Sequence, residues 1–146
     1  MKPSHALIAG LATLLACPSW ALEYRSTGRA AILYDAPSRT AAKLAVAGVG
    51  VPFEVFVDST DWVKVRDHTG RLAWVEKSAL GGRRSVMVMV DEALVRQQPQ
   101  EQAEPVFRAA RGVLLETQGE NNAGWLKVRH ADGYQGWVRQ YEVWGE

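Results

Sequence analysis

The feature that most constrains the fold of this chain is an internal repeat. The segment DWVKVRDHTGRLAWVEKSAL at residues 61–80 returns as GWLKVRHADGYQGWVRQYEV at residues 124–143. Residues kept in both copies include two tryptophans, a lysine and a turn glycine, in the pairs Trp62 and Trp125, Lys64 and Lys127, Gly70 and Gly133, Trp74 and Trp137. Farther upstream, Pro37 in the first copy matches Pro99 in the second. So many matches in a fixed order predict two similar folding units rather than one undivided domain.

Each copy has the pattern of β-structure throughout. Short runs rich in Val, Ile, Leu, Phe and Trp alternate with turn residues, and Asp132-Gly133 is a strong hairpin signal because glycine tolerates a positive φ. Prolines at positions 99 and 105 argue against a helix at residues 101–110, which we expect to form a loop and a short strand. The other expected strands are residues 29–35, 51–58, 62–66 and 72–76 in the first copy, and 86–90, 93–96, 112–117, 125–130 and 134–139 in the second. About five short strands in about 60 residues predict a small, partly open β-barrel.

Three motifs recur in the same order in both copies. The second copy contains ALVRQQP at residues 93–99, GWLKV at 124–128 and GWV at 136–138, and the first contains AILYDAP, WVKV and AWV at corresponding positions. In this order, the motifs resemble the bacterial SH3-like (SH3b) family, although Ala73 replaces the usual glycine of the third motif. The resemblance implies an all-β chain of two tandem SH3-like barrels. It also implies a short 3₁₀ turn near the end of each barrel, at residues 77–79 and 140–142.

The N-terminal segment has the composition of an export signal. Lys2 supplies a positive start, the apolar run of residues 6–16 is too short to span a bilayer, and Ser19-Trp20-Ala21 offers a cleavage site after Ala21. We therefore expect a signal peptide at residues 1–21, a first barrel at 22–82 and a second at 83–146. The expected location is the periplasm or the exterior of the cell.

Cys17 offers an alternative route to the envelope. The sequence Leu14-Leu15-Ala16-Cys17 resembles a bacterial lipobox, in which the cysteine becomes the lipidated first residue of a membrane-anchored protein. Pro18, directly after the cysteine, and the cleavage site at Ala21 favour release without a lipid. The lipid anchor and the free protein remain two open alternatives.

Composition argues against several classes of function. The 17 basic and 16 acidic residues nearly balance, and loss of Lys2 with the signal makes the count equal, so the basic footprint of a nucleic-acid-binding protein is missing. Beyond the signal the chain has no cysteine and two histidines, His68 and His130, which do not occupy equivalent positions in the repeat. Neither a nucleophile beside a base nor a metal-ligand spacing occurs. We interpret the chain as non-catalytic, with no cofactor and no metal.

Strand alternation indicates which residues face solvent. Because the lysines and arginines of WVKVR and WLKVR are costly to bury, the interleaved valines and leucine must point to the core and the tryptophans outward. The candidate ligand-binding residues are therefore aromatic and cationic side chains of this outer face: Trp62, Lys64, Trp74, Trp125, Lys127 and Trp137. Cross-strand packing and a barrel–barrel interface remain alternative roles for the same tryptophans.

The resemblance implies a binding role in the cell envelope. Relatives are often attached to wall-cleaving enzymes, where they hold peptidoglycan peptides, and others stand alone. The expected function is thus a non-catalytic exported module that recognises peptidoglycan or a peptide, with a cell-wall peptide or glycan as its partner. The alternative is a protein–protein adaptor or assembly subunit of an envelope complex. Recognition of proline-rich peptides is not expected, because Glu76 and Arg139 replace the proline of the eukaryotic SH3 groove.

Overall fold

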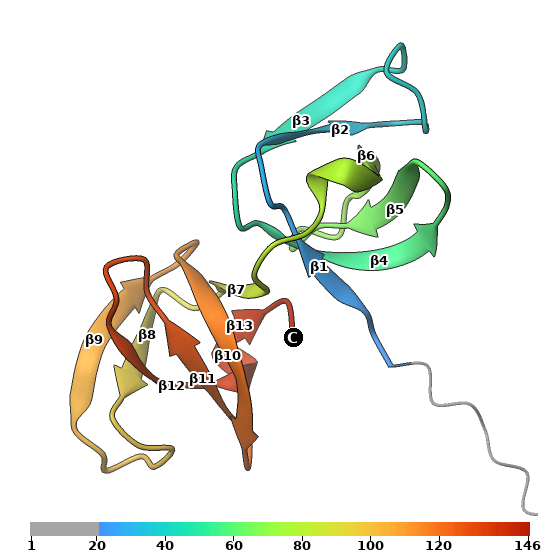
Figure 1. Ribbon diagram of the computed structural model, residues 1–146. Coiled ribbons are helices and arrows are strands. Elements are labelled where there is room, and N and C mark those ends of the chain that lie inside the picture. The colour runs from blue at the N-terminus through green and yellow to red at the C-terminus, as the bar shows by residue number, and fades with distance from the viewer. Residues whose placement is uncertain (1–20) are drawn as a thin grey trace, which may run out of the picture.

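The computed structural model describes residues 21–146, which form two antiparallel β-sheets, each curled around its own core (Figure 1). The expected signal peptide and Cys17 lie outside the described residues, apart from Ala21 at the expected cleavage site. Within residues 21–146 the helical segments are two 3₁₀ turns, and no helix there is long and apolar enough to cross a membrane. The fold is therefore all-β.

The first barrel contains six strands and one 3₁₀ turn. In chain order these are β1 (Tyr24–Ser26), β2 (Ala31–Tyr34), β3 (Lys43–Ala47), β4 (Pro52–Asp58), β5 (Trp62–Arg66), β6 (Leu72–Glu76) and the turn η1 (Lys77–Ala79). The strands follow the order β1-β4-β5-β6-β2-β3 across the sheet. Strand β3 therefore lies at one edge and β1 at the other.

The second barrel repeats this arrangement and adds one strand. Its elements are β7 (Ser85–Val88), β8 (Glu92–Arg96), β9 (Pro105–Ala110), β10 (Leu114–Asn122), β11 (Trp125–Arg129), β12 (Gln135–Arg139), the turn η2 (Gln140–Glu142) and β13 (Val143–Trp144). The order is β13-β7-β10-β11-β12-β8-β9, so the part from β7 to β9 reproduces the first sheet strand for strand and β13 covers the free edge of β7. This internal likeness confirms the predicted tandem of two SH3-like barrels.

The cores lie where strand alternation predicts them. In the first barrel Val63, Val65 and Phe53 are fully buried, and in the second Leu126 and Val128 are fully buried at the positions equivalent to the two valines. Each of these strands thus turns its aliphatic side chains inward and its charged side chains toward solvent. Both 3₁₀ turns also occupy the predicted residues.

Strand β3 is the main element that the sequence did not predict. Its outward residues are the apolar Leu44 and Val46, which are 42% and 74% exposed, whereas the small Ala45 and Ala47 face the barrel. The larger apolar side chains of this strand therefore point away from the core, whereas prediction from the sequence assumes that the apolar face of a strand is buried. The corresponding strand β9 follows a loop within residues 101–110, as predicted.

Candidate functional site

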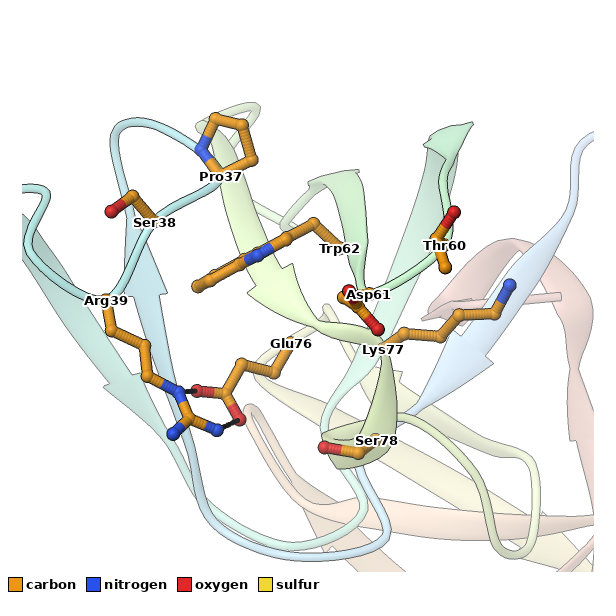
Figure 2. A pocket seen from close by; sticks show the side chains of 9 residues that line it. All are labelled: Pro37, Ser38, Arg39, Thr60, Asp61, Trp62, Glu76, Lys77 and Ser78. Atoms are coloured by element: carbon orange, nitrogen blue, oxygen red, sulfur yellow. Dashed lines mark hydrogen bonds and ion pairs between the residues drawn. The ribbon is translucent and has the colours of Figure 1, made fainter.

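A pocket with a volume of about 650 Å³ lies in the first barrel, where three segments converge (Figure 2). They are the loop between β2 and β3, the turn that leads into β5, and the end of β6 with the turn η1. The lining residues are Pro37, Ser38, Arg39, Thr60, Asp61, Trp62, Glu76, Lys77 and Ser78. This is the size of a cleft that takes a small ligand or a short stretch of peptide.

Trp62 forms the aromatic wall of the pocket. It is the first residue of β5, and because Val63 points into the core, the indole must leave the opposite face of the strand. The ring of Tyr34 packs edge-on against it, with centroids 5.4 Å apart and planes at 85°. The buried tyrosine fixes the orientation of the half-buried indole, which lies between Pro37 and Glu76 in Figure 2.

Two ion pairs frame the pocket. Arg39 binds Glu76 with two hydrogen bonds, 2.6 Å from Nε to Oε1 and 3.1 Å from Nη2 to Oε2. The guanidinium of Arg39 lowers the pKa of the Glu76 carboxyl below its ordinary value. Lys77 binds Asp58 at 2.7 Å, and this hydrogen bond is the main cause of a lowered pKa of the Asp58 carboxyl. The lowered pKa values favour the charged forms of the two carboxyl groups, Glu76 and Asp58.

Asp61 is the charged side chain of the pocket lining that has no ion-pair partner among residues 21–146. It lies next to Trp62 in the chain, it is exposed, and its backbone carbonyl accepts a hydrogen bond of 2.8 Å from the amide of Lys77. Its carboxylate makes no hydrogen bond or ion pair with any other residue of the described part, 21–146. The pocket lining thus includes a half-buried aromatic ring and an exposed carboxylate that has no side-chain partner among residues 21–146.

The corresponding place in the second barrel is closed. The Arg139 guanidinium lies over the Trp125 ring, 4.1 Å from its centroid, and donates a hydrogen bond of 2.7 Å from Nε to Glu101. Trp125 is only 4% exposed as a result. The expectation that Trp125 is open to solvent is therefore wrong: its strand position is as predicted, but Arg139 covers the ring.

The other four predicted residues form two cross-strand pairs. Lys64 stands directly opposite Trp74, and its Nζ lies 6.0 Å from the ring centroid. Lys127 and Trp137 repeat the arrangement at 5.9 Å. All four side chains are half-buried, and none of them lines the pocket around Trp62. Of the predicted set, the pocket contains Trp62 alone.

Sequence reasoning missed the charged residues of the pocket. Glu76 replaces the proline of the eukaryotic SH3 groove, and this replacement indicates that the position has a different chemistry. Arg39 lies in a loop, and its partner Glu76 is far away along the chain, so no local pattern predicts their contact. Asp61 belongs to a run of turn residues, and this pattern predicts a turn but no binding role. Among residues 21–146, no group of three or more His, Cys, Asp or Glu side chains is placed to hold a metal ion.

Comparison with known proteins places the chain in a family. Two segments, residues 28–82 and 89–145, match the bacterial SH3 domain. Since these segments make up most of the chain, the protein belongs to the bacterial SH3 domain family, with two copies in tandem, as the repeat predicts. No curated protein sequence matches the chain.

Several solved structures resemble the chain at low identity. NlpC2 of Trichomonas vaginalis is 12% identical with a TM-score of 0.39, and the match covers 86% of this chain and 49% of that one. NlpC1 of the same organism is 16% identical with a TM-score of 0.38, covering 94% and 51%. An NlpC/P60 family protein of Bacillus cereus is 16% identical with a TM-score of 0.39, covering 84% and 56%. The chain thus spans about half the length of these proteins.

Proposed function

We propose that the protein is an exported, non-catalytic binding module of the cell envelope, which holds a peptidoglycan peptide in the pocket around Trp62. The observation that carries the proposal is this pocket itself: about 650 Å³ of space with an aromatic wall and charged groups of both signs. Membership of the bacterial SH3 domain family supports a binding role. The expected signal peptide supports a location where the cell wall is within reach.

The chemistry of the lining suits a peptide that carries several kinds of polar group. The indole of Trp62 offers apolar surface on one side of the pocket, and Arg39, whose side chain is 77% exposed, retains donors directed to solvent. Asp61 offers a free carboxylate. Wall peptides combine carboxylates, amides and amines along a short chain, so each group of the pocket has a complementary group on such a ligand.

Strand β3 supports a second candidate, a protein–protein adaptor. It is one of the two edge strands of the first sheet, and it exposes Leu44 and Val46 on the same face. An exposed apolar edge strand is a surface to which a partner protein can add a strand. A stoichiometric partner recovered from envelope extract, and lost with Val46→Lys, would favour this alternative.

Co-sedimentation with purified sacculi tests wall binding. The unchanged protein should pellet with sacculi, and Trp62→Ala should bind about tenfold more weakly or worse, because buried aromatic anchors dominate binding energies. The matched control is Trp137→Ala, which removes an outer-face tryptophan that does not line the pocket. Circular dichroism checks that both variants fold. Failure of the unchanged protein to pellet, or equal losses in the two variants, would contradict the proposal.

A further inference from the structure

We propose that the ligand group bound at Trp62 is a cation, a primary ammonium or a guanidinium, and that the second barrel cannot take it because Arg139 already occupies the equivalent place. This inference deepens the proposed function and rests on the same pocket. It assigns the chemistry of the ligand and makes the two barrels unequal.

The second barrel shows how the site looks when it is filled. Arg139 lies on the face of Trp125 at 4.1 Å from the ring centroid, and Glu101 binds the same guanidinium through its carboxylate. A cation on an indole face with a carboxylate beside it is a complete cation site. Here the chain supplies both the site and its occupant.

The first barrel has the same framework with the charges exchanged. Glu76 stands at the strand position of Arg139, and Arg39 stands at the loop position of Glu101, so the ion pair is kept in reversed orientation. The cation–ring contacts within residues 21–146 involve Phe56, Trp74, Trp125 and Trp137, and no side-chain cation there lies over Trp62. The indole of Trp62 is therefore the counterpart of a cation-binding ring without its internal cation.

Asp61 supplies the carboxylate that such a ligand requires. Among the charged residues of the lining, Arg39 pairs with Glu76, and Lys77 pairs with Asp58 outside the lining, which leaves the charge of Asp61 uncompensated. The second barrel has Gly124 at the equivalent position, where an internal cation already has Glu101 as its partner. At this position, the barrel with the open ring has a carboxylate and the barrel with the covered ring has none.

These observations select one class of ligand. A peptide bearing a free amine, such as the side-chain amine of a diamino acid, would place an ammonium on the indole, in a pocket whose lining includes the Asp61 carboxylate. A peptide whose amines are acylated keeps its apolar and amide groups but loses both interactions. Discrimination between free and acylated amines is the property that this site should show.

Nuclear magnetic resonance of the ¹⁵N-labelled full-length protein tests the inference through the indole N–H signals. The probes are Nα-acetyl-lysine methylamide and its Nε-acetylated form, which differ in one charge. We expect a saturable shift of the Trp62 signal with the first probe alone and no shift of the Trp125 signal. Asp61→Asn should weaken the response about two- to fivefold, as expected for loss of an exposed ion pair.

Arg139→Ala is the complementary variant, because it uncovers Trp125 and removes the main partner of Glu101, whose remaining ion pair is with Arg96 at 4.0 Å. The Trp125 signal should then begin to respond to the free-amine probe, and the Trp62 response should not change. Equal shifts with both probes, no shift of Trp62 with either, or a Trp125 response in the unchanged protein would each overturn the inference. Loss of sacculus binding with amine discrimination intact would overturn the proposed wall ligand and leave the cation site standing. Sacculus binding without discrimination between the two probes would overturn the cation site and leave the proposed wall ligand standing.

Discussion

The backbone amide of Ser85 donates a hydrogen bond of 3.0 Å to the Oγ atom of Ser26. Ser85 begins β7 in the second barrel and Ser26 ends β1 in the first, so the contact joins equivalent strands of the two units, and both side chains are buried. The Ser85 hydroxyl also donates to the carbonyl of Gly50. Nearby, the ring of Trp144 packs edge-on against Tyr24, with centroids 5.3 Å apart. Polar and aromatic contacts thus fix the two barrels to each other.

Gly145→Ala should weaken this interface. Gly145 has a φ of +118°, and an added Cβ would stand 2.7 Å from the Cβ of Pro52 in the first barrel and 3.0 Å from the carbonyl oxygen of Ser85. We expect a loss of about 2 kcal/mol in the free energy of unfolding, measured by urea denaturation. The control is Gly133→Ala, whose φ of +95° carries a similar backbone cost but whose Cβ would meet no atom within 4 Å. Equal losses in the two variants would show that the contact with Pro52 contributes nothing.

Gly136→Ala should destabilise the second barrel. An added Cβ would lie 2.6 Å from the carbonyl oxygen of Arg96 and 2.7 Å from Cγ1 of Val95, so β8 and β12 must separate to admit it. The first barrel has a buried alanine, Ala73, at the same position, and its backbone spacing already accommodates a methyl group. Hydrogen exchange should show that the free energy of opening at the Val138 amide falls by about 1–3 kcal/mol. The free energy of opening at Val75 in the first barrel should not change. Uniform opening of both barrels would contradict this account.

The cores of the two barrels were predictable from the sequence, but the state of each binding site was not. Alternation along WVKVR and WLKVR placed Val65 and Val128 correctly, because a strand with a lysine and an arginine on one face can bury only the other. Whether the indole at the start of each strand is open depends on one side chain at the end of the next strand, Glu76 or Arg139. That side chain is in turn oriented by a loop residue distant in sequence, and strand periodicity carries no information about such a contact.

The Arg39–Glu76 pair should make stability depend on pH. The pKa of Glu76 is lowered from its ordinary value of 4.5, chiefly by its hydrogen bonds with Arg39. The unfolded chain therefore binds a proton more readily than the folded one, so the pair contributes its full stabilisation above pH 4.5 and loses it as the pH falls through the lowered pKa. Melting curves of the unchanged protein and of Glu76→Gln should differ at neutral pH and converge in acid. A difference that stays constant with pH would contradict this assignment.

Val65→Asp should unfold the first barrel. The side chain of Val65 is fully buried in the core of the first barrel. An aspartate there would place an unpaired charge in the core and lower the free energy of unfolding by more than about 4 kcal/mol. Val57→Asp is the matched control, since Val57 belongs to the paired strand β4 but its side chain is 46% exposed. Far-ultraviolet circular dichroism should report loss of structure in the first variant and near-normal structure in the second. A folded Val65→Asp protein would mean that this strand face does not form the core.

Binding at Trp62 is tested most directly by titrating the ¹⁵N-labelled protein with soluble muropeptides from digested sacculi and following the indole N–H signals. We propose that the first barrel binds the ligand at Trp62 and that the second barrel, closed by Arg139, does not bind at Trp125. We expect a progressive shift of the Trp62 signal while the Trp125 signal stays in place. A shift of Trp125 or Trp137 with Trp62 unmoved would contradict it.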